Sequence, residues 1–146
     1  YTTSSNIIKN NVKNWTSIYR PINDVIDIMD AKIINFAVEF SLVTSPMFNS
    51  SDVISLAIIE LEDYFSDKMY IGEPLYVTRI YQRLNQIAGV VDVKDVKIRV
   101  KSGGVYSPHT IDMDEIMSRH GTLYKAPKNV IFEMKFPNLD IKGVIR

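Results

Sequence analysis

The first 20 residues carry apolar side chains at the spacing of an α-helix. At 100° per residue these side chains fall within about 140° of arc, with only Asn11 among them. They are Ile7, Ile8, Val12, Trp15, Ile18 and Tyr19. Ser4 or Ser5 can cap the start of the helix, and Pro21 closes it. Residues 1–21 are therefore predicted to form an amphipathic helix, packed either on its own domain or, as a connector, on a partner.

After this helix the pattern changes to the two-residue alternation of β-strands. Residues 33–43 alternate between large apolar side chains and smaller or polar ones. The apolar row is Ile34, Phe36, Val38, Phe40 and Leu42. Residues 93–101 and 129–136 alternate in the same way, and Pro137 ends the second of these runs. Three strands are therefore predicted.

Two helices are predicted between the first and second strands. The Ser-Ser-Asp sequence at residues 50–52 offers a cap and an acidic first turn for a helix over residues 52–67. A second helix is predicted over residues 78–88, with Thr78 as its cap and Gly89 at its C-terminal end.

The rest of the chain shows weaker patterns. Residues 105–128 are expected to be loop-rich, with at most a short helix from Asp112 to about Arg119, and residues 138–146 show no clear period. The order strand, helix, helix, strand, loop, strand favours an α+β fold of two layers. Residues 22–146 are accordingly predicted to form one α+β domain, with a mixed or antiparallel sheet and helices packed on one face.

Composition narrows the classes of function. The 146 residues suit one domain, and 17 basic residues balance 17 acidic ones, so net charge does not indicate a strongly basic nucleic-acid-binding protein. The absence of cysteine excludes disulfide scaffolds, thiol nucleophiles and iron–sulfur sites. No apolar run approaches the ~20 residues of a membrane helix, so no membrane partner is predicted. The chain begins at Tyr1 without an initiator Met and is interpreted as a fragment of a longer polypeptide.

Residues that could carry chemistry form no familiar constellation. His109 and His120 lie in a loop-rich region and lack the short spacing of metal ligands on one element. Glu62 and Asp63 belong to the polar side of a predicted helix. The chain has no Gly-rich phosphate loop and no nucleophile elbow. We therefore predict that it is not an enzyme and has no catalytic, cofactor or metal site and no small-molecule substrate.

Exposed positions on three elements are the candidates for contacts with partners. They are Trp15 and Tyr19 on the N-terminal helix, Ile59 on the polar face of the helix over 52–67, and the basic row Lys97, Arg99 and Lys101 on the strand over 93–101. The basic row also supports an alternative function, that of an α+β domain binding nucleic acid. Because the row lacks aromatic residues on which bases could stack, nucleic acid is the less favoured partner.

Several segments, taken in their order and spacing, resemble a known family. They are RPINDVIDI (20–28) followed by AKIINF (31–36), IGEPLYVTRI (71–80), GVVDV (89–93), APKNVIFE (126–133) and FPNLDIKG (136–143). Together they resemble the C-terminal part of the baseplate wedge subunits of T-even-type contractile-tailed phages, which are related to the wider baseplate J-like family. The resemblance covers about residues 5 to 143.

The resemblance implies a structural role without an active site. Subunits of this family sit in wedges around the tail hub, pair with a second copy of themselves, and join neighbouring wedges into a ring that changes shape when the tail contracts. The implied partners are a second copy of the chain and other baseplate wedge proteins. The implied location is the tail baseplate of the virion, assembled in the host cytoplasm. No motif of the family fixes interface residues, so none is carried over.

Overall fold

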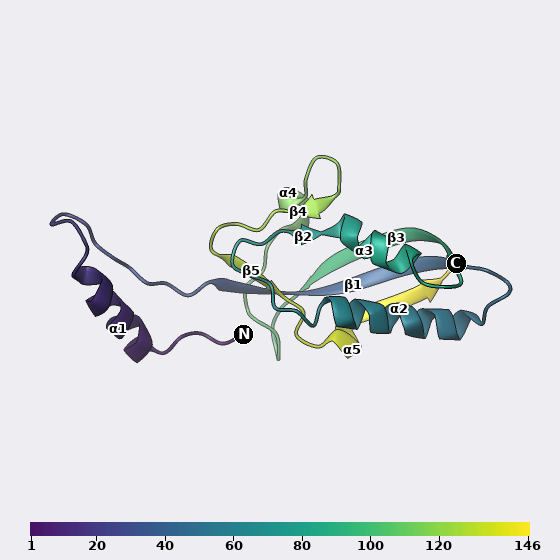
Figure 1. Cartoon of the computed structure of the whole chain (residues 1–146), viewed down its shortest axis with the longest axis horizontal. Coiled ribbons are helices and arrows are strands. Elements are labelled where there is room, and N and C mark those ends of the chain that lie inside the picture. Colours follow the sequence, from purple (N-terminus) through teal and green to yellow (C-terminus); the bar gives the residue numbers. More distant parts are fainter.

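A computed structural model describes all residues from 1 to 146. Figure 1 shows a body of sheet and helices, from one end of which an N-terminal arm projects. The helices are α1 (Asn6–Ser17), α2 (Ser50–Tyr64), α3 (Val77–Asn85), α4 (Met113–Ile116) and α5 (Pro137–Asp140). The strands are β1 (Lys32–Thr44), β2 (Leu75–Tyr76), β3 (Val90–Lys101), β4 (Leu123–Tyr124), β5 (Val130–Glu133) and β6 (Ile141–Ile145). The α+β class and the N-terminal helix are confirmed.

Strand β1 is the centre of a mixed sheet. β3 pairs with it antiparallel along one edge, from the Asn35–Lys101 pair to the Thr44–Val90 pair. β5 and β6 pair with it parallel, β5 along residues 32–35 and β6 along residues 38–42. β5 and β6 thus follow one another beside β1, and α5 lies in the excursion between them. Both strands are slightly longer than predicted: β1 extends one residue beyond each end of the predicted range 33–43, and β3 begins at Val90 instead of residue 93.

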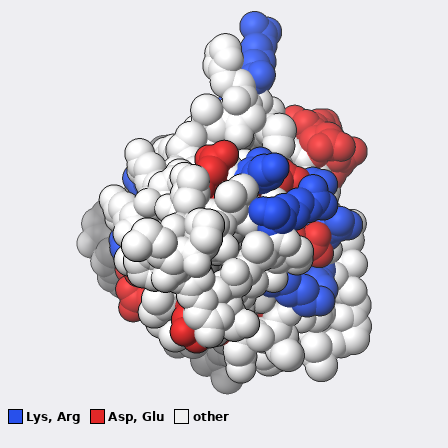
Figure 2. All heavy atoms as spheres, turned by 90° about the vertical axis from the view of Figure 1, so that its right-hand side faces the viewer, with Lys and Arg blue, Asp and Glu red and all other residues white.

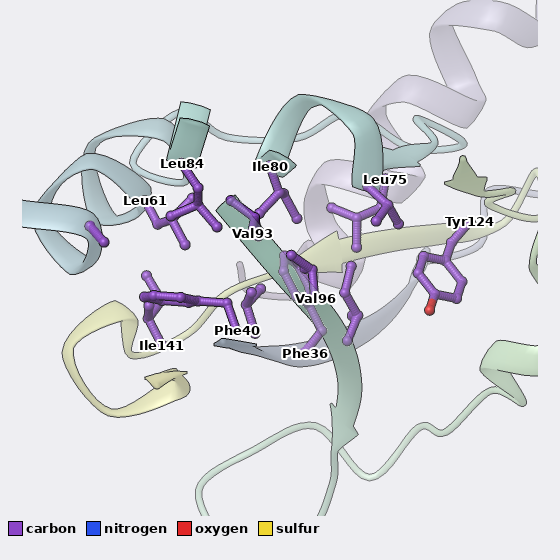
Figure 3. Packing of buried hydrophobic residues seen from close by; sticks show 14 of the residues in the cluster. Phe36, Phe40, Leu61, Leu75, Ile80, Leu84, Val93, Val96, Tyr124 and Ile141 are labelled. Atoms are coloured by element: carbon purple, nitrogen blue, oxygen red, sulfur yellow. The ribbon is translucent and has the colours of Figure 1, made fainter. Parts of the chain in front are cut away.

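The core lies between the sheet and the two longest helices of the body. The inward row of β1, which includes Phe36 and Leu42, is fully buried, as the alternation of its sequence predicts. Leu61 of α2 and Leu84 of α3 pack against this row in one hydrophobic cluster. Figure 3 shows Leu61, Ile80 and Leu84 pointing from the helices toward the sheet. Helices α2 and α3 therefore cover one face of the sheet.

Helix α2 differs from the prediction at both ends. Its cap is Asn49, whose side chain accepts a hydrogen bond from the backbone N–H of Ser51, so the Ser-Ser-Asp sequence lies inside the first turn. The helix ends at Tyr64 and does not reach residue 67. Phe65 leaves the helical path and packs edge-on against Phe36, with ring centroids 5.4 Å apart. The partly buried Phe65 ring thus packs against the core directly after the end of α2.

Helix α3 also differs, because a backbone group replaces the expected cap. It runs from Val77 to Asn85, so Thr78 is an interior residue and the predicted range 78–88 is wrong by three residues at its end. The carbonyl oxygen of Thr122 accepts from the N–H groups of Val77 and Thr78, at 3.0 and 3.3 Å. These donors are free at the start of any helix, and a carbonyl satisfies them as a side-chain cap does.

The region expected to be loop-rich, residues 105–128, contains the short strand β4, which pairs with the short strand β2 before α3. β2 and β4 pair antiparallel, Leu75 with Tyr124 and Tyr76 with Leu123. This pairing brings Thr122 to the start of α3, and both Leu75 and Tyr124 are buried. Two residues are too few to show a period, so the sequence pattern does not reveal them.

The third predicted strand, residues 129–136, is shorter than expected. β5 ends at Glu133, and Phe136 turns to pack edge-on against Tyr106 at 5.7 Å. Pro137 then begins α5, where its missing N–H costs nothing. The tail without a clear period forms α5 and β6. Gly143 of β6 lies so close to the core that an added Cβ would sit 2.5 Å from Cζ of Phe40.

Two buried polar residues fix the loop after β3. The carboxylate of Asp140 accepts from the hydroxyl of Tyr106 at 2.7 Å and from the backbone N–H of Phe136 at 3.1 Å. The side chain of Asn35 accepts from the N–H of Ser107 at 2.7 Å. The hydrogen bond to Asp140 raises the pKa of Tyr106 above its ordinary value of 10.0. The loop is therefore tied to both β1 and α5.

Replacing Leu61 by Ala should lower the free energy of unfolding by about 2–5 kcal/mol, because the side chain is fully buried and its removal leaves a cavity. Ile59 on the same helix is 59% exposed, so Ile59→Ala should change the free energy of unfolding by less than about 0.5 kcal/mol. Urea unfolding followed by circular dichroism measures both. Equal losses in the two variants would contradict the assigned inner face of α2.

Replacing Tyr106 by Phe should cost about 1.5–3 kcal/mol at neutral pH, because a buried carboxylate loses a donor. The raised pKa in the folded state means that the phenol contributes stability below pH 10 and loses it as pH rises through the raised value. Alkaline destabilisation should therefore be weaker in Tyr106→Phe than in the wild type, measured by urea unfolding across alkaline pH. The control is Tyr70→Phe, because Tyr70 is 78% exposed. A parallel pH response in wild type and Tyr106→Phe would count against this role.

Candidate interaction surface

The N-terminal arm consists of α1 and the segments on either side of it. Figure 1 shows α1 standing away from the body, joined to it by residues 1–5 on one side and residues 18–31 on the other. The Ser5 side chain accepts from the N–H of Ile8 and caps the helix, as one of the two predicted alternatives. No residue of α1 is buried. The apolar stripe predicted from the sequence is therefore not covered by the body.

Trp15 and Tyr19, which are predicted from the sequence to contact partners, lie together on this arm. Trp15 is 64% exposed and Tyr19 is 74% exposed, and their ring centroids are 5.6 Å apart. Tyr19 follows the end of α1 at Ser17, so the helix itself is shorter than the stripe. The other exposed members of the stripe are Ile7, Ile8, Val12 and Ile18. The stripe is an apolar surface in contact with solvent, interrupted only by Asn11.

The opposite side of α1 is polar and is held by the returning chain. Lys9 forms an ion pair with Asp30, and Lys13 lies 3.6 Å from Asp27. The N–H of Ser4 also donates to Asp30 at 3.3 Å. The hydrogen bond from Lys9 lowers the pKa of the Asp30 carboxyl below its ordinary value of 3.8. The returning segment thus lies against the polar side of α1, and the apolar side remains exposed.

The returning segment contains exposed apolar residues that sequence reasoning assigned no role. Ile22, Val25 and Met29 are all largely exposed. The segment forms no strand and no helix, so its residues cannot be divided into faces by period. In the sequence, the only signal for an exposed apolar surface here is the high proportion of apolar residues in the segment that directly follows the amphipathic helix.

Ile59 occupies the outer face of α2, as the sequence places it. Leu56 lies one turn before it and is also exposed. Asp52 and Asp63 lie one further turn away at either end of this pair and are exposed as well. The apolar patch on α2 is therefore two residues long and closed by carboxylates. Solitary exposed apolar residues of this kind are common on monomeric proteins.

The predicted basic row lies on β3, on the face of the sheet away from α2 and α3. Two of its three members are paired with acidic neighbours: Nζ of Lys97 lies 3.2 Å from Asp95, and Nε of Arg99 donates to Glu39 at 2.9 Å. Lys101 has no ion pair. Figure 2 shows the same interspersion of basic and acidic side chains at the end of the body remote from the arm. The row presents less positive charge than its sequence suggests.

Other surface features offer little for chemistry. A hollow of about 230 Å³ lies between the end of α2 and the start of α3, where Arg79 stacks over Tyr76 and Arg83 pairs with Glu60. No group of three His, Cys, Asp or Glu residues is arranged to hold a metal ion. His109 and His120 are both exposed. None of the helices is both long and apolar enough to cross a bilayer.

The candidate residues belong to separate surfaces. Trp15 and Tyr19 are neighbours on the arm, Ile59 lies on α2, and the basic row lies on β3. Figure 1 shows the arm well away from both α2 and β3. Of these surfaces, the arm has the greatest exposed apolar area.

The chain matches no known protein-family model and no curated protein sequence.

Proposed function

We propose that the chain is a structural subunit of a phage tail baseplate wedge, acting through self-association and through contacts with other wedge proteins in the ring around the tail hub. In this proposal the chain is part of the tail baseplate of the virion, and the baseplate is assembled in the host cytoplasm. The resemblance of residues 5–143 to that family supports the proposal, and so does the exposed arm. The function requires surfaces that bind other subunits and requires no active site.

The observation that carries the proposal is the uncovered stripe of α1. Each apolar side chain of this size gains roughly 1.5–3 kcal/mol when it is buried, so six of them represent on the order of 10 kcal/mol. This gain is comparable with the cost of bringing two proteins together, which is about 4–15 kcal/mol. A stripe of this extent on a helix without buried residues is typical of a surface that another protein covers.

The shape of the molecule suits the same role. The body has its own core, with a buried cluster of 19 hydrophobic residues that includes none from the arm. The arm can therefore be covered by a neighbour without rearrangement of the body. An interaction element carried outside a stable body is a suitable way to join subunits that must remain folded when their assembly changes shape.

The proposal predicts self-association that depends on the stripe. Replacing Trp15 by Asp places a charge in the centre of the stripe and should weaken self-association at least about tenfold, since aromatic residues commonly dominate binding energy. Sedimentation velocity over low to high micromolar concentrations measures this. The matched control is Asn10→Asp, which adds the same charge on the polar side of α1. Thermal unfolding of the body should be unchanged in both variants.

A wild-type chain that remains monomeric at high micromolar concentration and does not co-assemble with the other wedge proteins of a contractile-tailed phage would overturn the proposal. Co-assembly is tested by mixing the purified proteins and observing the particles by electron microscopy. Loss of association in Asn10→Asp as well as in Trp15→Asp would show that the apolar stripe is not responsible.

The alternative function, nucleic-acid binding through Lys97, Arg99 and Lys101, is the weaker one because two of these residues have acidic partners. The expected result is weak binding to oligonucleotides with a shallow salt dependence, measured by fluorescence anisotropy. Replacing Glu39 by Gln, which frees Arg99, should increase the residual binding. Tight binding of the wild type with a steep salt dependence, lost in Arg99→Ala, would favour the alternative instead.

A further inference from the structure

We propose that the free edge of β3 binds an extended acidic segment of another protein, which adds to the sheet as a further strand. The site is the stretch of residues 95–101, and the acidic side chains of the segment lie on the face of the sheet that carries the basic row. This inference goes beyond the proposed function, because it rests on backbone pairing in the body and does not involve the arm.

The backbone of β3 has one edge without a partner. β3 lies at the end of the strand order, and its only partner in the sheet is β1. No backbone group of residues 95–101 forms a hydrogen bond with any part of the chain other than β1. In an antiparallel ladder, the N–H and C=O groups of every second residue are directed away from the partner strand. An added strand can satisfy these outward groups in regular order.

This edge is both long and regular. Residues 95–101 pair with β1 without a break in register, and the irregularity between Ser41 and Leu42 of β1 lies beyond them. The opposite edge of the sheet is divided between β5 and β6, which have 4 and 5 residues. Short edge strands and bulges hinder the addition of a strand. β3 therefore offers an extended segment the longest template in the sheet.

Helix α3 provides a wall beside this edge. α3 packs on β3 and α2 packs on β6, with α2 and α3 in contact above the sheet. Arg83 of α3 pairs with Glu60 of α2, and Tyr81 lies about 200° around the helix from Arg83, on the flank away from α2. Tyr81 is half-buried and packs against the core. It thus lies on the side of the free edge, where it can cover inward-facing side chains of an added strand.

The charges of the exposed face favour an acidic segment. Residues 95–101 carry three basic side chains and one acidic side chain. The side chains of an added strand lie directly opposite those of β3, with Cβ atoms about 4.5–5.5 Å apart. Acidic residues at alternate positions of the segment would therefore meet the basic row, and Lys101, which has no ion pair within the chain, would gain a partner.

The same charges disfavour a second copy of β3 as the occupant. When two identical edges pair antiparallel in one continuous sheet, the basic row of each copy lies on the same face as that of the other. Basic side chains would then lie opposite basic side chains, and like charges in this position destabilise a strand pair. The added strand is therefore expected from a chain of different sequence.

The probe for this site is a short synthetic peptide in which Glu and Val alternate, and its control is the peptide in which Lys replaces Glu. Fluorescence anisotropy of the labelled peptides measures their binding to the full chain. The Glu peptide should bind at least about tenfold more tightly than the Lys peptide, because several cross-strand charge pairs change sign. Equal binding of the two peptides, or no binding of the Glu peptide, would overturn the inference.

Two N-methylated versions of the Glu peptide test whether its backbone takes part. Methyl groups on the nitrogens of all Glu residues block one edge of the extended peptide, and methyl groups on those of all Val residues block the other. Because addition to β3 uses a single edge, one version should lose binding and the other should retain most of it. An equal effect of both modifications would show that charge alone attracts the peptide, and strand addition would then be wrong.

Two variants of the chain locate the edge that binds. Lys97 of β3 and Lys142 of β6 both lie directly opposite Glu39 of β1, on its two sides. Lys97→Glu should weaken binding of the Glu peptide about three- to tenfold, because a repulsion replaces an attraction. The matched control Lys142→Glu makes the same change on the other edge and should alter binding less than about twofold.

Lys97→Glu should also bind the Lys peptide more tightly than the wild type does, a gain that loss of folding could not produce. Equal weakening of Glu-peptide binding by Lys97→Glu and Lys142→Glu would contradict the assignment of the site to β3. Unchanged binding of both peptides in Lys97→Glu would contradict it as well.

Discussion

Strand β1 pairs with neighbouring strands along both of its edges, and the other elements of the body are arranged around it. β3 satisfies one row of its backbone groups, and β5 and β6 in succession satisfy the other. Its inward side chains are then covered by α2 and α3, which closes a single core. Because this core is complete without α1, the apolar residues of the arm contribute nothing to the stability of the body. That independence is the physical basis for reading the arm as a binding element.

The sequence predicted the longest elements well, because their side chains repeat often enough to show a period. β1, β3, α2 and α3 follow from alternation or helical spacing. The errors lie at helix ends where the chain makes long-range contacts: Phe65, directly after α2, packs on Phe36, and the carbonyl of Thr122 accepts from the first N–H groups of α3 in place of a side-chain cap. β2, β4 and α5 were not predicted, because two to four residues show no period unless, as for β5, the alternation continues past the end of the element or, as for α4, a cap residue marks its start.

The candidate surface was predictable in part. Sequence alone placed Trp15 and Tyr19 on one side of a terminal helix, and it left open whether that helix packs on its own domain. Periodicity shows which residues share a face, but not whether the chain folds back to cover that face. In the arm, the structure shows Lys9 and Lys13 on the polar side paired with Asp30 and Asp27 of the returning segment, and the apolar side left exposed. The pairing of Arg99 with Glu39 was likewise invisible, since it joins strands 60 residues apart in sequence.

The arm is attached to the body at two points. After α1, residues 18–31 lead directly into β1. Before α1, the hydroxyl of Tyr1 donates to the carbonyl of Met69 in the body. A tensile load applied to the helix would enter the sheet mainly along the axis of β1. The hydrogen bonds that join β1 to β3 and β5 lie across that axis, so they would be loaded together in shear instead of opening one after another. Strand β1 would then pass tension from the arm into the sheet without its hydrogen bonds to the neighbouring strands breaking one at a time.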